Sequence, residues 1–317
     1  MDRRGTGGSL TTETTEFSVG FVCQPVRSLV ETFESLPVDS LWVGGHVAST
    51  NPSPEAMIQL ARLAALTSRV RVGTSILLLP LYPPAIVAKQ VADLDHATGG
   101  RVTLGVGVGG EYPQEFRACQ IPLSERGSRT DEAIPLLRRL WSGEEQSHTG
   151  RFYPMEGVRI HPPPVQPHGP PIIVAGRKER AMQRAVALGD GWMPYLYTAR
   201  RYAASVETIR RLADEAARDL TDFEWLAFVF VNVHDDAELA KEDAAEFLGG
   251  NYRQDFHSML AHIAVAGSPD EVVAGLAEFV RAGATHLVFT PASRGRSEAV
   301  ALRIINEIVP RVRAALR

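Results

Sequence analysis

Short apolar runs alternate with longer amphipathic stretches along most of the chain. In the stretch 84–98, Val87, Val91 and Leu94 follow one another at spacings of four and three, which places them on one face of a helix. An apolar run followed by such a stretch predicts a strand followed by a helix. The predicted strands are residues 17–22, 40–43, 70–74, 102–106, 171–175, 192–194, 224–233 and 286–290. The predicted helices are residues 26–34, 54–66, 84–98, 130–140, 178–187, 199–219, 269–283 and 297–316.

Two helix starts carry capping signals. Ser53 stands directly before the helix 54–66, where a serine hydroxyl can accept a hydrogen bond from a free backbone N–H group. The segment 268–271 combines a serine N-cap, a proline at the first helical position and two acidic residues in the first turn. Both signals predict that a helix begins there.

Two segments interrupt the alternation. Residues 144–166 contain the rigid run 161–164, a histidine followed by three prolines, and this composition favours a surface excursion or a hairpin over a helix. A helical stretch at 237–262 follows the seventh predicted strand and precedes its expected helix. We interpret both segments as insertions, one after the fourth helix and one after the seventh strand.

Eight strand-then-helix units in 317 residues are typical of an α/β protein with the TIM (β/α)8 barrel fold. We therefore expect a single barrel domain over residues 17–317, preceded by a polar, flexible tail at 1–16. A doubly wound sheet is the competing fold. Its dinucleotide fingerprint would follow the first strand, whereas the glycine-rich run of this chain follows the fourth and has no helix directly after it.

The glycine-rich run 105–110 closes the fourth predicted strand. Leu104 and Val106 can pack in a core, but Gly107, Gly109 and Gly110 leave the backbone without side chains. Bare backbone allows a flat ligand to lie close to the chain, so this run is a candidate bed for a cofactor. The alternative is that the glycines only allow a crowded backbone to turn.

In a TIM barrel, functional residues lie on the loops that follow the strands. Here these loops offer small residues and few protonatable groups, which suits a large planar ring better than a metal ion. Only His46 stands at a strand end with clear acid–base capacity near neutral pH. No metal site is expected, because none of the nine histidines forms a His-Glu-x-x-His motif.

Composition narrows the class of protein further. The chain is 44% apolar and 22% charged, as ordinary globular proteins are, and its net charge of −4 argues against a nucleic-acid partner. There is no run of 18 apolar residues and no apolar stretch in the first 16, so we expect no membrane span, no signal peptide and a cytoplasmic location. Cys23 and Cys119 are too few for a disulfide framework.

A series of short motifs, in the same order along the chain, resembles the luciferase-like monooxygenase superfamily. Each motif is short, and the ordered series spans about residues 17–310. The segments that carry the resemblance are 41–46, 85–89, 93–95, 99–107, 126–132, 171–176, 190–192 and 267–269.

The resemblance implies a flavin-type TIM barrel in the branch of oxidoreductases that use the deazaflavin coenzyme F420. Members of this branch place a histidine at the end of the second strand, and His46 matches that position. The family often has an acidic residue just before this histidine, where this chain has Gly45. The family also tends to hold a non-prolyl cis peptide at the end of the third strand, which would fall around Thr74, Ser75 and Ile76.

The implied chemistry concerns one hydride and one proton. A deazaflavin passes a hydride in a two-electron step, so the protein has to hold the two carbons together and manage charge. His46 is expected to exchange the substrate proton, with Glu111 as the second candidate; the alternatives are that His46 is hydrogen-bonded within its own loop and that Glu111 pairs with the arginine-rich segment 126–129. The cofactor phosphate is expected at Gly176 and Arg177, where a helix begins. The residues expected to bind the cofactor are Thr74, Ser75, Ile76, Gly107, Val108, Gly109, Ala175, Gly176, Arg177 and Met193.

Three functions are compatible with this sequence. The favoured one is hydride transfer between coenzyme F420 and a small-molecule substrate, because the corner at Gly45 and His46 is short and the helix after the fifth strand begins with cationic residues that suit an acidic tail. The second is an FMN-dependent monooxygenase, which would need a separate flavin reductase as partner and would trap a peroxyflavin away from water. The third is a non-catalytic flavin-binding barrel. Similar barrels commonly pair, so we also expect a homodimer.

Overall fold

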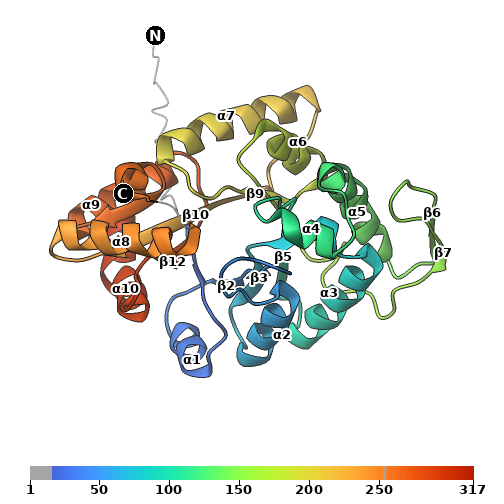
Figure 1. Cartoon of the computed structure of the whole chain (residues 1–317), viewed down its shortest axis with the longest axis horizontal. Coiled ribbons are helices and arrows are strands. Elements are labelled where there is room, and N and C mark those ends of the chain that lie inside the picture. Colours follow the sequence, from blue (N-terminus) through green and yellow to red (C-terminus); the bar gives the residue numbers. More distant parts are fainter. Residues whose placement is uncertain (1–15, 253–254) are drawn as a thin grey trace, which may run out of the picture.

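A ring of helices surrounds a closed barrel of parallel strands in the computed structural model, which describes residues 16–252 and 255–317 (Figure 1). Within these residues the strands occupy eight positions around the barrel, and the pairings of β9 with β10 and of β12 with β1 close it. The barrel strands are β1 (Ser18–Val22), β2 (Ser40–Val43), β3 (Arg71–Thr74) with its continuation β4 (Leu77–Leu78), β5 (Val102–Gly107), β8 (Ile172–Ala175), β9 (Gly191–Met193), β10 (Glu224–Val233) and β12 (His286–Pro291). The predicted TIM barrel is confirmed.

Each barrel strand is followed by at least one helix that covers its outer side, so the strands are buried on both faces. All residues of β2 and β5 are buried, which explains why they appear in the sequence as continuous apolar or small runs. The covering helices are α1 (Arg27–Ser35), α2 (Ala56–Leu66), α3 (Pro84–Thr98), α5 (Arg126–Leu140), α6 (Glu179–Leu188), α7 (Ala199–Glu215), α9 (Pro269–Arg281), and α10 (Ser297–Arg303), which continues through the π-helical turn η4 (Ile304–Ile308) into α11 (Val309–Ala315).

One of the two capping predictions is confirmed and the other is wrong. Ser268 forms a complete capping box at the start of α9. Helix α2 begins later than predicted, and its N-cap is Glu55, whose carboxylate accepts a hydrogen bond from the backbone N–H of Ile58 at 2.7 Å. The carbonyl oxygen of Pro54 accepts a hydrogen bond from the backbone N–H of His46, so the chain stays extended there and Ser53 lies outside the helix.

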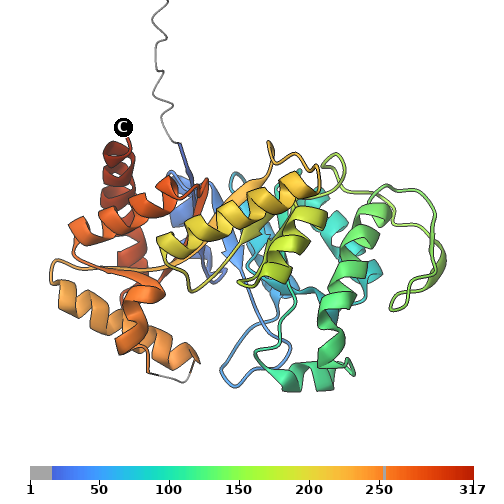
Figure 2. The same cartoon turned by 90° about the horizontal axis from the view of Figure 1, so that it is seen from above.

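Both predicted insertions leave the barrel, on opposite sides of the molecule (Figures 1 and 2). The first contains an antiparallel hairpin of β6 (Gln146–His148) and β7 (Met155–Val158), as the sequence suggested. The second contains α8 (Ala237–Tyr252), the 3-10 helix η3 (His257–His262) and β11 (Ala264–Gly267). Strand β11 was not predicted, and it pairs with the last four residues of β10 outside the barrel.

Three short elements fill the connections near the carboxyl ends of the strands. They are η1 (Leu79–Leu81), α4 (Pro113–Ala118) and η2 (Leu123–Glu125). Helix α4 was not predicted, because six residues are too few to display a helical period. Among the described helices, none combines the length and the apolar character that a bilayer span requires. Most of the tail predicted at 1–16 lies outside the described residues.

Candidate active site

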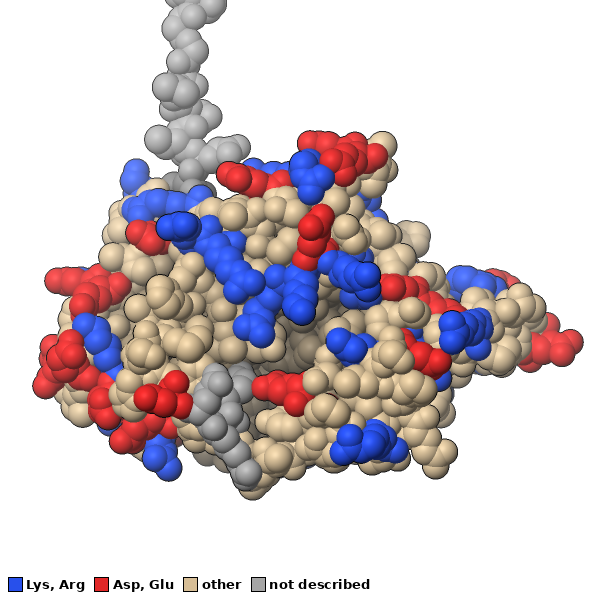
Figure 3. All heavy atoms as spheres, turned by 45° about the horizontal axis from the view of Figure 1, so that its top comes forward, with Lys and Arg blue, Asp and Glu red and all other residues tan. Residues whose placement is uncertain are grey.

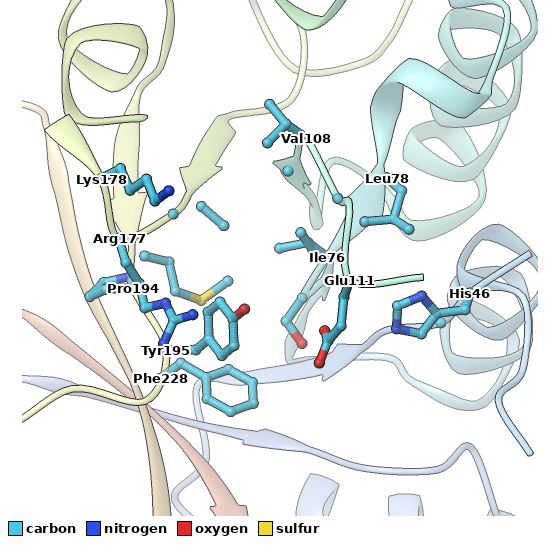
Figure 4. Close-up of a pocket in the computed structure, with 17 residues that line it drawn as sticks. His46, Ile76, Leu78, Val108, Glu111, Arg177, Lys178, Pro194, Tyr195 and Phe228 are labelled. Atoms are coloured by element: carbon cyan, nitrogen blue, oxygen red, sulfur yellow. The ribbon is translucent and has the colours of Figure 1, made fainter. Parts of the chain in front are cut away.

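A cavity of about 300 Å3 opens at the carboxyl ends of the barrel strands (Figure 4). This volume is at the lower end of the range typical of small-molecule sites. Every residue predicted for the site lines this cavity except Thr74. The lining residues are Gly45, His46, Ser75, Ile76, Leu78, Gly107, Val108, Gly109, Glu111, Ala175, Gly176, Arg177, Lys178, Met193, Pro194, Tyr195 and Phe228.

The floor of the cavity at Gly107 and Gly109 is backbone without side chains. A Cβ atom at Gly107 would lie 2.0 Å from the Cδ1 atom of Ile76, and Gly109 has a φ of +63°, in the left-handed region that favours glycine. Below them, a Cβ atom at Gly105 would lie 1.9 Å from the carbonyl oxygen of Thr74. Thr74 therefore packs beneath the floor, where its hydroxyl donates to the Gly105 carbonyl at 2.7 Å, and the prediction that it contacts the cofactor is corrected.

The peptide bond between Ser75 and Ile76 is cis, in the place that the resemblance implied. The Ser75 hydroxyl is buried and has no hydrogen-bond partner among the described residues, although Ser75 lines the cavity. A bare floor with an unsatisfied hydroxyl beside it fits a planar heteroaromatic ring that carries polar groups on its edge. The residues present therefore fit a flavin or a deazaflavin.

His46 is held at the edge of the cavity by a carboxylate. Its Nδ1 atom lies 3.2 Å from the Oε2 atom of Glu115 and 3.4 Å from Oε1. The imidazole is 26% exposed, whereas the Glu115 side chain is completely buried. The ring of Tyr112 packs edge-on against the imidazole, with ring centres 4.8 Å apart. Figure 4 shows the His46 ring facing the cavity and Glu111, so the histidine is not enclosed in its own loop.

Glu115 is a site residue that the sequence reasoning missed. It lies in α4, directly after the glycine floor, and Pro113 at the start of this helix was the one local signal that a helix begins there. The contact with His46 joins residues 69 positions apart, so no spacing rule applied to the sequence reveals it.

Glu111 lies on the loop after the glycine floor, and its carboxylate points toward Tyr195 across the cavity (Figure 4). Within the described residues it does not pair with the segment 126–129. Arg129 pairs instead with Glu125 at 2.9 Å, and Arg126 donates to a backbone carbonyl. The Glu111 carboxylate is therefore available to a bound molecule.

Arg177 and Tyr195 form the opposite wall. The Arg177 guanidinium carbon lies 4.6 Å from the centre of the Tyr195 ring, a cation–π geometry. Burial raises the pKa of the Tyr195 hydroxyl, the charge of Arg177 opposes this shift and the charge of Glu111 adds to it. Three lining residues were not predicted as site residues. Tyr195 lies beyond the end assigned to its strand, whereas Pro194 and Phe228 lie within predicted strands whose pattern does not mark them as lining the barrel mouth.

A larger cleft of about 760 Å3 adjoins the cavity at Gly176. It runs from the amino-terminal end of α5 along the length of α6. Lys178, Arg180 and Arg126 line it without an ion pair to any described carboxylate. Arg184 also lines it, paired with Asp131 at 2.5 Å. Figure 3 shows Lys and Arg side chains concentrated beside a hollow in one face of the molecule. Backbone N–H groups and cations together favour an anionic group in this cleft.

The sequence profile of the luciferase-like monooxygenase family matches residues 4–286. The chain is 28% identical over 312 residues to an F420-dependent glucose-6-phosphate dehydrogenase of Microbacterium testaceum. This alignment covers 88% of the present chain and 90% of that protein. Uncharacterized mycobacterial proteins match more closely over a shorter segment. They are 36% identical over 167 residues, and this segment spans 53% of the present chain and only 57% of theirs.

Solved structures share the fold. The coenzyme F420-dependent tetrahydromethanopterin reductase of Methanopyrus kandleri superposes with a TM-score of 0.79 at 19% identity, covering 93% of this chain and 99% of that one. The oxygenating constituent of 3,6-diketocamphane monooxygenase from Pseudomonas putida, solved with FMN, superposes with a TM-score of 0.73 at 18% identity, covering 93% and 98%.

Proposed function

The chain belongs to the luciferase-like monooxygenase family of oxidoreductases, and we propose that it transfers a hydride between the deazaflavin coenzyme F420 and a small organic substrate. The observation that carries the proposal is the position of His46. Its imidazole, backed by the Glu115 carboxylate, faces a cavity whose floor is bare backbone at Gly107 and Gly109. A seat for a planar ring and a group that can exchange a proton thus lie side by side.

The cofactor ring would lie on the backbone of Gly107, Val108 and Gly109, with the Ser75 hydroxyl at its edge. The backbone N–H groups at the start of α6, next to Gly176, would hold its phosphate. When bound, the deazaflavin supplies or accepts the hydride. The remaining tasks fall to the protein, which has to orient the substrate carbon against the ring and handle the proton.

His46 would hold or release that proton at Nε2, because Nδ1 is occupied by Glu115. A well-placed general acid or base of this kind contributes a factor of about 10²–10⁴ to the rate. The Glu111 carboxylate would accept a hydrogen bond from a polar group of the substrate, and the wall of Tyr195 and Phe228 would pack against its apolar part and exclude water.

The cationic cleft supports F420 over FMN. The cleft of about 760 Å3 includes the expected phosphate position at Gly176 and extends past it along Lys178 and Arg180, which suits a cofactor whose acidic tail extends past the phosphate. The second candidate is an FMN-dependent monooxygenase, which is supported by the FMN bound to the Pseudomonas relative and by the same glycine floor. In that case no part of the cofactor would occupy the cleft beyond the phosphate.

Titration of the purified protein with each cofactor tests the proposal. We expect coenzyme F420 to bind, with a change in its absorbance and fluorescence, and FMN to bind at least tenfold more weakly. Bound F420 should then be reduced by members of a panel of small hydroxy compounds, without consumption of oxygen. Tight binding of FMN with no response to F420 would favour the FMN-dependent monooxygenase over the F420-dependent enzyme. Oxygen uptake with reduced FMN would establish the monooxygenase activity.

A further inference from the structure

We propose that Glu115 is a positioning residue for His46, which fixes the imidazole so that Nδ1 carries a proton toward Glu115 and Nε2 faces the cavity. The inference rests on the proposed function only for the role of Nε2 in exchanging the substrate proton. The orientation itself follows from the contacts of Glu115, and these are independent of the cofactor.

The Glu115 carboxylate has a single polar partner among the described residues. Its side chain is 0% exposed, and both of its oxygens face the Nδ1 atom of His46. The neighbouring Tyr82 hydroxyl does not serve it, because that group donates to Glu55 at 2.6 Å. A buried carboxylate without a hydrogen-bond donor is strongly unfavourable. The requirement of Glu115 for a donor therefore holds the histidine ring in place.

The chemistry of the pair determines which nitrogen carries the proton. An ionised carboxylate only accepts hydrogen bonds, so Nδ1 of His46 has to be the donor. The neutral imidazole then has Nε2 free of hydrogen, ready to accept a proton from a group in the cavity. The edge-on contact with the Tyr112 ring restrains the imidazole on a further side. A carboxylate bonded to Nδ1 holds the acid–base histidine of Ser-His-Asp sites in the same way.

The backbone explains why the carboxylate comes from α4. Gly45, which precedes His46, cannot carry an acidic side chain, because a Cβ atom there would lie 1.9 Å from the carbonyl oxygen of Pro54. Glu115 follows the glycine floor by a few residues, so one continuous segment provides both the seat for the ring and the orienting carboxylate. The two functions are thereby fixed relative to each other.

The tautomer of His46 can be measured on the full chain without cofactor. We would record nitrogen NMR spectra of protein labelled with 15N-histidine, at a pH where the ring is neutral, and assign His46 by its loss in His46→Ala. The wild-type protein should show hydrogen on Nδ1, and Glu115→Gln should raise the population with hydrogen on Nε2, because an amide can also donate. Glu132→Gln is the matched control, since Glu132 pairs with His148 at the same 3.2 Å but away from the cavity.

Kinetics then separate positioning from a general structural role. Glu115→Gln should lower kcat by about 10-fold or more, because the amide no longer fixes the tautomer of the imidazole, with KM and cofactor Kd within about threefold of wild type. In a His46→Ala background the same substitution should cause no further loss. Equal losses in the two backgrounds, an unchanged kcat, or a wild-type ring with hydrogen on Nε2 would overturn the proposal. If F420 is not the cofactor, the NMR result still decides the orientation, so the two proposals fail separately.

Discussion

Replacement of Gly107 by alanine tests whether the floor of the cavity is a seat for a planar ring. The new Cβ atom would lie 2.0 Å from the Cδ1 atom of Ile76, whereas carbon atoms in contact are about 3.5–4.0 Å apart. The tip of the Ile76 side chain therefore has to move by roughly 1.5 Å. Ile76 itself lines the cavity of about 300 Å3, so the displaced group takes up space that the ring would use.

We expect Gly107→Ala to affect both stability and cofactor binding. Overpacking at Ile76 should lower the free energy of unfolding by about 1–3 kcal/mol. The affinity for the cofactor should fall at least tenfold, which corresponds to about 1.4 kcal/mol or more. This loss of stability alone leaves the chain folded, because the free energy of unfolding of native domains is roughly 5–15 kcal/mol.

The assay is a fluorescence titration with whichever cofactor the wild-type protein binds, combined with denaturant unfolding of the same samples. Gly295→Ala is the matched control, because a Cβ atom there meets no heavy atom within 4 Å. If Gly107→Ala binds the cofactor as tightly as the wild-type protein does, the ring does not lie on this floor, and the assignment of the cavity is refuted.

Three further predictions concern other parts of the site and the barrel. His46→Ala should lower turnover by about 10²-fold or more while cofactor affinity stays within several-fold, as comparison of kcat and Kd will show; unchanged turnover would remove His46 from the mechanism. Lys178→Ala should weaken F420 binding several-fold and reduce its salt dependence, with a smaller effect on FMN, and equal effects on both would argue against an anionic tail in the cleft. Burial lowers the pKa of His286 to about 3. Between about pH 6.5 and pH 3 this histidine is therefore protonated in the unfolded chain but neutral in the folded chain. The free energy of unfolding should fall over that window by up to about 1.4 kcal/mol per pH unit as the pH is lowered. Urea unfolding between pH 7.5 and pH 5 should show a shallower fall for His286→Gln, and parallel slopes would contradict this cause.

Much of the fold could be predicted because burial on both faces leaves its mark on the sequence. The apolar runs of β2 and β10 and the helical period of α3 gave bounds that match the structure. Strand β11 was not predicted, because Ala264–Gly267 is short and Val265 is the one large apolar residue in it. The start of α2 was placed too early, because the bond between the Pro54 carbonyl and the His46 N–H is made across a loop.

The parts of the candidate site that depend on the backbone at strand ends could be predicted. The contacts between side chains from different segments across the barrel mouth could not. The glycines at 107 and 109 and the position of His46 followed from the strand ends. Thr74 is buried beneath the floor instead of lining the cavity, because its hydroxyl donates to the Gly105 carbonyl of the neighbouring strand, a contact that no local pattern reveals. Glu115 and Tyr195 reach the site from segments whose own sequence has no pattern pointing there.

The second insertion is attached to the barrel at two places, through the strand β11 and through Asp243 of α8, which accepts hydrogen bonds from Asn232, Ser293 and Arg296. Its strand β11 pairs only with Phe230–Val233 at the far end of β10, while the pairs that close the barrel involve β9 and residues 226–231 of β10 with β12. A segment of different length between the end of β10 and the capping box at Ser268 leaves the pairs that close the cylinder in place, but it has to replace the contacts that Asp243 makes with Ser293 and Arg296. Chimaeras made at these two joints would test whether the barrel folds with a different segment in this place, because no described residue of the insertion lines the cavity.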